Sequence, residues 1–263
     1  MKLWAKLPLA VVMLLVLAAC RPTDARAIWK DGIKKCATTD LIGPDVLYFG
    51  PSNTLGPGTV FERFSTGGIQ ESHLLPSYIN PPDPVISPNP GTFACTSDRA
   101  AKMNLSAEVP LDAVLPIGAA AAAHLKKARS VKVWADELQW VALLTGPYKE
   151  KVIALPATHT VRKDLEAGHL VLSRALRVKG LKAELEFSSD VGADVKAAVP
   201  SVSGAKDIKL GGAWDGTTKL TISAASDFFI AGELREWKGG LSAADEVGPP
   251  VRNAGSLIYK SKQ

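Results

Sequence analysis

The chain has 263 residues, a net charge of +5, 46% hydrophobic residues and 22% charged residues. This composition excludes a disordered chain, a collagen-like repeat and a small disulfide scaffold. The basic excess is small and contains no long run of lysine and arginine, so nucleic acid is not an expected partner. The length is sufficient for one large globular domain, or two small ones, behind a targeting segment.

The strongest signal lies at the N-terminus. Lys2 and Lys6 form a positive segment that precedes an uncharged apolar run over residues 7–19. This run is too short to span a hydrocarbon core of about 30 Å, and it has the form of a signal-peptide apolar region. It ends in Leu-Ala-Ala-Cys at residues 17–20. That sequence resembles the lipobox of bacterial lipoproteins, and the resemblance covers only the first twenty-one residues.

The resemblance implies that residues 1–19 are a signal peptide, that the chain is cut before Cys20, and that Cys20 carries acyl chains such as palmitate. Two or more acyl chains make a stable membrane anchor. In Gram-negative lipoproteins an Asp after the cysteine favours retention at the inner membrane. This chain has Arg21, so we expect an outer-membrane lipoprotein that faces the periplasm.

A second cleavage site is also present. Ala25-Arg26-Ala27 fits a signal peptidase that would release a soluble protein after Ala27. Charged residues at positions 21, 24 and 26 separate this site from the apolar run, which favours cleavage before Cys20.

The other two cysteines, Cys36 and Cys95, are expected to form one structural disulfide, because paired cysteines of exported proteins become oxidised outside the cytoplasm. The bridge would close a loop of about sixty residues, worth about 3–4 kcal/mol in the chain-entropy model. A redox pair is disfavoured because the two cysteines are far apart in the sequence and form no Cys-x-x-Cys motif.

Beyond the signal peptide, the sequence divides into four parts. Residues 20–35 are predicted to form a lipidated tether, and residues 36–102 a Pro- and Gly-rich segment pinned by the disulfide. Residues 103–238 form the predicted core, and residues 239–263 a C-terminal tail. The fold class is α+β, with a mainly antiparallel twisted sheet and two or three packed helices.

In the first half of the chain, short strands are predicted at residues 45–49 and 59–64. The first is expected to end at Gly50-Pro51. Six prolines between residues 76 and 90 predict a long extended loop, because proline cannot donate to a sheet or sit inside a helix. The alanine-rich segment 118–129 ends in cations, which predicts a helix.

The next segment is less clear. Residues 130–134 alternate like a strand. A helix is favoured for residues 136–144, with Asp136 as its N-cap and Gly146-Pro147 as its end. Residues 152–155 are short and apolar and predict a further strand.

The clearest strand signal covers residues 176–187. Its apolar residues fall on even positions before Gly180 and on odd positions after it. A one-residue change of phase would turn the later side chains to the other face. A bulge or sharp bend at Gly180 is therefore expected, because it would keep one continuous buried face.

The C-terminal third contains a predicted hairpin. Its preferred form has the loop Trp214-Asp215-Gly216 with Gly216 left-handed, which pairs residues 210 and 208 with residues 220 and 222. Trp214 would then be an exposed loop residue and a candidate contact surface. A short helix is predicted at 190–199, and strands are predicted at 228–237 and 256–259.

No recognised catalytic motif is present. Ser203 and Lys206 fit a Ser-x-x-Lys pattern, but they precede a predicted strand rather than opening a helix. His159 and His169 bracket Asp164 and Glu166, which is a conceivable metal set, but the spacing fits no metal motif. No cofactor is expected, and no catalytic residue is assigned.

The sequence therefore favours a non-enzymatic, membrane-anchored envelope lipoprotein that binds an unidentified partner. One alternative is a binder of small apolar ligands or lipid, with a pocket between the sheet and the alanine-rich helix. Another is a hydrolase, which would need a cleft that gathers His159, Asp164 and His169. A membrane-perturbing role is ranked last because the predicted sheet carries many charges.

Overall fold

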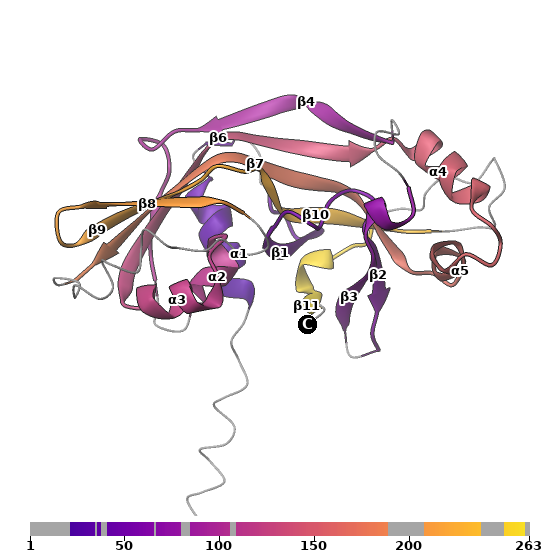
Figure 1. The fold of residues 1–263 in the computed structure, drawn as a ribbon, viewed down its shortest axis with the longest axis horizontal. Helices are drawn as coiled ribbons and strands as arrows, with labels where there is room; N and C mark the ends of the chain where they lie inside the picture. The colour runs from indigo at the N-terminus through magenta and orange to yellow at the C-terminus, as the bar shows by residue number, and fades with distance from the viewer. Residues whose placement is uncertain are drawn as a thin grey trace, which may run out of the picture.

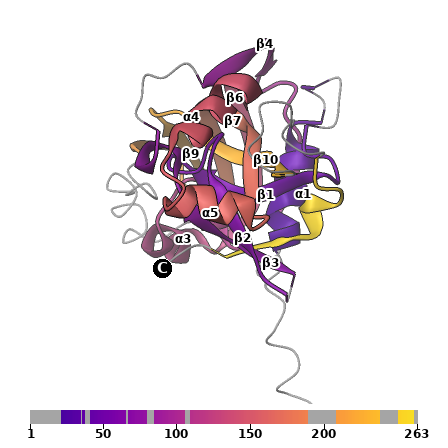
Figure 2. The same cartoon turned by 90° about the vertical axis from the view of Figure 1, so that its right-hand side faces the viewer.

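In a computed structural model, the residues described are 22–34, 36–37, 41–65, 67–79, 85–105, 109–188, 208–237 and 250–260. They form a mainly antiparallel sheet with helices packed on it, which confirms the α+β fold class. Figure 1 shows the long strands arching over the helices, and Figure 2 shows the same arrangement from the end. No helix in this part of the chain is long and apolar enough to cross a bilayer.

Eleven strands join in one sheet within the described residues. Their bounds are β1 Val46–Ser52, β2 Val60–Arg63, β3 Gly68–His73, β4 Ile86–Cys95, β5 Lys102–Asn104, β6 Ala128–Leu143, β7 Leu170–Phe187, β8 Leu210–Asp215, β9 Lys219–Ala224, β10 Phe228–Glu236 and β11 Ile258–Lys260. All pairs are antiparallel except β11, which runs parallel to β3. The strands expected at 45–49, 59–64, 130–134, 176–187, 228–237 and 256–259 are thus confirmed, with shifted ends.

Strand β7 is the centre of the sheet. Along one edge it pairs first with β2 and then with β6, and along the other it pairs first with β10 and then with β9. Its apolar side chains line one continuous core, from Leu176 and Val178 to Leu181, Ala183 and Leu185. The other ten strands are therefore connected to this strand directly or through one or two intervening strands.

The predicted change of phase at Gly180 is confirmed. Gly180 has φ +63°, and from Leu176 onward the buried positions are even before Gly180 and odd after it. The facing strand β6 changes phase at the same level, between Ala135 and Leu138. The register between β6 and β7 does not shift across this point, because Ala135 pairs with Leu181 and Glu137 pairs with Lys179. Both strands therefore bend together, and one face stays buried.

Five α-helices are described: α1 Pro22–Gly32, α2 Leu111–Val114, α3 Ala119–Leu125, α4 Thr145–Ala154 and α5 Thr160–Glu166. Helix α3 confirms the alanine-rich prediction, although it is shorter than residues 118–129. Helix α1 packs on α2, and α2 packs on α3. In Figure 1 these three helices lie beneath β6 and β7, whereas α4 and α5 lie at the other end of the sheet.

Two predictions between residues 136 and 155 are wrong. The expected helix at 136–144 is the second half of β6, and the expected strand at 152–155 belongs mostly to α4. Pairing with β7 buries Leu138 and Trp140, and this tertiary contact outweighs local propensity. Pro147 lies in the first turn of α4, where the missing N–H has no helical acceptor to lose.

The proline-rich segment is only partly a loop. Residues 86–95, which include Pro88 and Pro90, form β4, and β4 pairs only with β6 among the described strands. An edge position is where proline is tolerated in a sheet. Strand β1 likewise continues through Gly50-Pro51 to Ser52, with a register shift and φ +78° at Gly50.

The hairpin β8–β9 has a different register from the predicted one. Leu210 pairs with Ala224, and Trp214 pairs with Leu220. The loop is residues 216–218, so it has three residues and a left-handed Gly216 as expected, but it begins two residues later. This register places Trp214 and Leu220 side by side over the core. Matching the apolar residues of the two short segments by sequence did not reveal this pairing.

Candidate functional site

The first candidate region is the N-terminal helix, which follows the predicted lipid attachment residue. Cys20 lies outside the described residues, and α1 begins two positions later at Pro22. Ala25, Ile28 and Trp29 are buried in the main core, and the Trp29 indole donates a hydrogen bond to the Val114 carbonyl at 2.8 Å. This differs from the tether that was expected over residues 20–35.

Arg26 adds a polar clamp to the same helix. Its guanidinium donates to the carbonyl oxygens of Gly255, Ile42 and Gly43, which come from segments far apart in the sequence. A cation that satisfies several backbone acceptors gives charge-assisted hydrogen bonds, which are stronger than neutral ones. Arg26 therefore ties α1 to the C-terminal segment as well as to the loop before β1.

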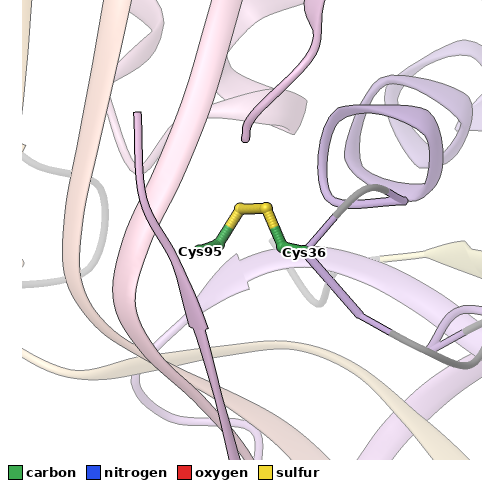
Figure 3. The surroundings of a disulfide bond; sticks show 2 residues. All are labelled: Cys36 and Cys95. Carbon is green, nitrogen blue, oxygen red and sulfur yellow. A yellow bond between two sulfur atoms is a disulfide. The ribbon is translucent and has the colours of Figure 1, made fainter. Parts of the chain in front are cut away.

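The predicted disulfide between Cys36 and Cys95 is confirmed, with Cα atoms 4.9 Å apart and a sequence separation of 59 residues (Figure 3). It joins the segment that follows α1 to the end of β4. The Ala101 amide also donates to the Gly32 carbonyl at 3.0 Å. The bridge therefore fixes the end of α1 against the sheet. We assign it a structural role.

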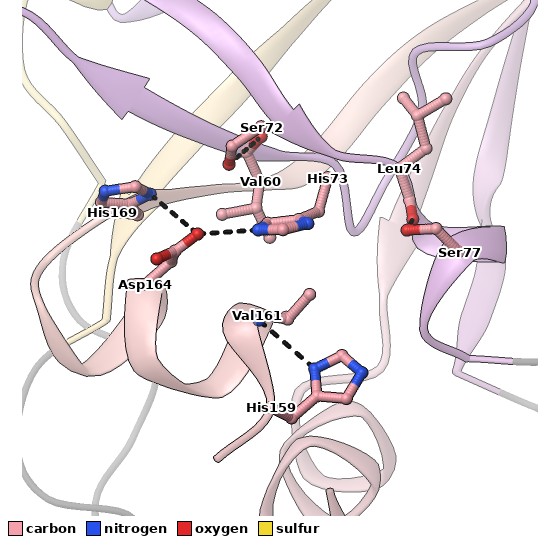
Figure 4. Close-up of polar contacts among 9 residues, drawn as sticks. All are labelled: Val60, Ser72, His73, Leu74, Ser77, His159, Val161, Asp164 and His169. Carbon is pink, nitrogen blue, oxygen red and sulfur yellow. Dashed lines mark hydrogen bonds and ion pairs between the residues drawn. The ribbon is translucent and has the colours of Figure 1, made fainter. Parts of the chain in front are cut away.

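The second candidate region is a cluster of two histidines around one carboxylate (Figure 4). His73 Nε2 lies 2.7 Å from Asp164 Oδ2, and His169 Nδ1 lies 3.8 Å from the same oxygen. The three side chains are between 20% and 33% exposed. They connect the end of β3 to α5 and to the residue that precedes β7.

The structure divides the histidine and acid set that the sequence singled out. His159 lies at the other end of α5, where its Nδ1 accepts a hydrogen bond from the Val161 amide and caps the helix. Glu166 pairs with Arg162 instead. His73, rather than His159, lies beside Asp164. His73 and Asp164 are 91 residues apart in the sequence, so no local spacing could have indicated this contact.

The neighbours of the cluster are engaged in other contacts. The neighbouring Ser72 hydroxyl donates to the Val60 carbonyl and is not directed at His73 (Figure 4). Within the described ranges, no three His, Cys, Asp or Glu side chains are placed to hold a metal ion. The hydrogen bond from His73 to Asp164 is sufficient to explain the cluster as a link between β3 and α5.

The tryptophans of the described residues are buried in the core or packed against it. Trp214, expected in an exposed loop, lies in β8 and is half-buried, with its ring 5.6 Å from that of Phe187. Trp140 is buried under the Arg174 guanidinium, 4.5 Å from its ring centre, and Trp237 packs edge-on against Tyr148. The prediction that Trp214 lies in the loop is wrong, because the turn begins two residues later, at Gly216.

Tyr48 and Tyr148 are buried inside this framework, and Tyr78 is half-buried against it. The Tyr48 hydroxyl donates to the Ala113 carbonyl at 2.6 Å, and the Tyr78 and Tyr148 hydroxyls lie 2.8 Å apart. Burial raises the pKa of each phenol well above its ordinary value, and for Tyr78 the neighbouring Tyr148 adds to the shift. These phenols stay neutral in the folded protein and act as hydrogen-bonding core residues.

The third candidate region is an apolar pocket of about 150 Å³. It lies between the loop before β2, the short helix at Leu75–Ser77, and the starts of β4 and β10, with these lining residues: Asn53, Thr54, Leu55, Gly56, Pro57, Thr59, Leu75, Pro76, Ile86 and Phe229. Ile86, at 38% exposed, forms part of its rim. The pocket does not lie between the sheet and the alanine-rich helix, where a ligand site was expected.

Two remaining predictions fall outside the described residues. These are the Ser203 and Lys206 pair and the short helix at 190–199.

Comparison with known proteins adds little. No protein-family model matches the chain, and no curated protein matches it either. Among solved structures, it is similar to a bacterial gasdermin from Bradyrhizobium tropiciagri, with 14% sequence identity and a TM-score of 0.48. The match covers 84% of this chain and 95% of that one. A likeness at this level supports no functional assignment.

Proposed function

We propose that this chain is a bacterial envelope lipoprotein, anchored through acyl chains on Cys20, that acts as a non-enzymatic binding module. Arg21 after the cysteine favours the outer membrane, with the domain facing the periplasm. The resemblance of residues 17–20 to a lipobox supports the anchor. The way the next helix is built into the fold supports the position of the cut.

Helix α1 is the observation that carries this proposal. Cleavage before Cys20 leaves α1 whole. Cleavage after Ala27, at the alternative site, would divide α1 within Pro22–Gly32 and remove Ala25 and Arg26 from the mature chain. Ala25 is fully buried, and Arg26 donates to three backbone carbonyls. A processing step that removed these contacts would destabilise its own product, so the fold favours the cut before Cys20.

A binding role is favoured over catalysis by what the polar side chains do. Asp164 and His73 bind one another, His159 caps α5, and Glu166 pairs with Arg162. The pocket is lined mostly by apolar groups and contains no histidine, acid or cysteine. The groups that a hydrolase would use are therefore engaged in holding elements together.

The test is the intact mass of the full chain extracted from the membranes of a Gram-negative host, before and after reduction. A mass that corresponds to an acylated chain beginning at Cys20, with two hydrogens gained on reduction, supports the proposal. An unmodified chain beginning at Ile28 contradicts it. Cys20→Ala is the control, because it removes the acylated thiol and leaves α1 and the disulfide unchanged.

Membrane sorting gives a second readout. Arg21→Asp should move the protein from the outer-membrane to the inner-membrane fraction, and Arg21→Lys should leave it in the outer membrane. If the two variants distribute in the same way between the inner-membrane and outer-membrane fractions, the outer-membrane assignment is contradicted, whereas the proposed lipid anchor is not.

The apolar pocket favours a second candidate function, the binding of a small apolar ligand. Its volume of about 150 Å³ is close to that of engineered cavities that hold benzene, and smaller than the pockets that enclose drug-sized ligands. Benzene should therefore shift the NMR signals of Leu75 and Phe229. Ile86→Trp should fill the pocket and abolish the shifts. Leu144→Trp is the matched control, because Leu144 is equally exposed, at 37%, but does not line the pocket. Absence of shifts in the unmodified protein would contradict ligand binding here.

A further inference from the structure

Three exposed cations lie where α3 ends and β6 begins. Lys126 and Lys127 directly follow the helix, Arg129 is the second residue of β6, and all three side chains are exposed. None of them forms an ion pair with a residue in the described part of the chain. Elsewhere on the surface, cations such as Lys102, Lys179 and Arg174 are paired with glutamates. Within the described residues these three cations have no paired acid, and an anionic surface outside the domain would attract them.

The position of α3 is linked to the lipid anchor. Cys20 and Pro22 are two residues apart, so the chain between them spans at most about 7 Å. Helix α1 is fixed to α2 through Trp29 and Val114, and only residues 115–118 separate α2 from α3. An acylated Cys20 would therefore hold the domain close to the bilayer on the side where α1 begins, with α3 packed nearby through α2.

The charge of the domain makes this local group important. Removal of residues 1–19 also removes Lys2 and Lys6, which leaves the mature chain with a net charge of +3. The total is too small to orient the domain by itself. Anionic bilayers attract basic groups within a Debye length, which is about 8 Å at physiological ionic strength. The acids nearest to this group among the described residues are Asp112 on α2, Asp136 on β6, and Glu186 on β7, which lies opposite Ser130 and is paired with Lys102.

We propose that Lys126, Lys127 and Arg129 bind the headgroups of an anionic bilayer and hold the anchored domain in one orientation, with α3 against the membrane. This inference rests on the proposed lipid anchor. It adds a second contact, which sets orientation rather than attachment. In that orientation β4 points away from the bilayer, because α3 and β4 lie at opposite sides of the molecule in both views (Figures 1 and 2).

The test uses the full acylated protein reconstituted in vesicles. With Cys20 acylated and Cys36 bonded to Cys95, an introduced cysteine is the single free thiol. One variant carries a fluorophore at Ala123→Cys, which is exposed on α3, and the control carries it at Ile86→Cys on β4. Vesicles of phosphatidylcholine, with or without phosphatidylglycerol, contain a lipid with a nitroxide on its headgroup that quenches nearby fluorophores.

The expected result is strong quenching at position 123, weak quenching at position 86, and a difference that requires phosphatidylglycerol. Replacing Lys126, Lys127 and Arg129 together by Gln should remove the preference. Each cation near an anionic surface contributes about a fivefold factor, so the three together should change the orientation equilibrium about a hundredfold. Circular dichroism checks that the triple variant is folded.

Other outcomes overturn the inference. Equal quenching at both positions would show that the domain has no preferred orientation. Quenching at position 123 that persists in the Gln variant, or without phosphatidylglycerol, would show that these cations do not cause it. The mass of the same sample separates the two proposals: absence of acyl chains refutes the lipoprotein function and this inference with it, whereas an acylated protein without the quenching pattern refutes the inference alone.

Discussion

The bend shared by β6 and β7 allows a sharp prediction at Gly180. Its φ of +63° is in the left-handed region, and a Cβ added there would lie 2.2 Å from Asp136 Oδ2 and 2.9 Å from Asp136 Cβ. Gly180→Ala therefore introduces two separate costs. One is the strain of a side chain at a left-handed position, and the other is overlap with the facing strand at the point where both strands bend.

The two costs have different sizes and can be separated. A left-handed conformation costs about 1–2 kcal/mol for a residue with a Cβ. Overlap inside a packed contact costs about 1–3 kcal/mol, and the restricted unfolded chain returns about 0.4–1 kcal/mol. The expected loss in the free energy of unfolding is therefore about 1–5 kcal/mol. Since the three atoms nearest to the added Cβ all belong to Asp136, Asp136→Gly should remove the second cost and leave the first.

Urea denaturation of the oxidised protein measures these values. Gly168→Ala is the matched control, because Gly168 has φ +92° and nothing within 4 Å of an added Cβ, so it carries the backbone cost alone. Gly180→Ala should destabilise more than Gly168→Ala, and the excess should disappear in an Asp136→Gly background. The salt bridge from Asp136 to Lys182 is well exposed and contributes little. Equal losses at the two glycines would refute the reasoning.

Three further predictions concern stability. Arg26→Ala should lower the free energy of unfolding by about 2–4 kcal/mol, because several buried carbonyls lose a charged donor, and urea denaturation should show that Arg26→Lys restores only part of it. Replacing Cys36 and Cys95 together by Ala should cost about 3–4 kcal/mol, seen as a lower midpoint; an unchanged midpoint would contradict a stabilising bridge. Because burial raises the pKa of Tyr148 above 10.0, the unfolded phenol ionises first, and stability should fall as pH rises beyond 10. Tyr148→Phe should make that fall shallower by about 1.4 kcal/mol per pH unit in denaturation series, and an unchanged slope would contradict the assignment.

Patterns confined to one strand were the most reliable guide to the fold. The phase change at Gly180 was predicted from residues 176–187 alone, because the two-residue period of a strand makes a one-residue slip visible in the sequence. The alanine-rich helix was predicted for a similar reason, since propensity summed over consecutive residues is a local property. The cysteine pair was predicted because only two cysteines remained after Cys20.

Predictions failed where a distant partner decides the outcome. Residues 136–144 have helical signals, yet they extend β6 because β7 offers a long edge that buries Leu138 and Trp140. The predicted hairpin register was chosen because it matched Leu210 with Leu220. The observed register instead places Trp214 beside Leu220 and over the core. In both cases the side chain that decides the structure lies on another strand.

The candidate sites show the same division. The sequence by itself predicted a targeting signal and a candidate anchor at Cys20, because both depend on residue type and short spacing, and it determined the bridging cysteines, because only two were left to pair. Only the tertiary structure brought His73 to Asp164, built Arg26 into three backbone contacts, and formed the pocket from four separate segments. These arrangements depend on which surfaces pack together. Packing is set by the burial of the whole chain, and no short segment carries that information.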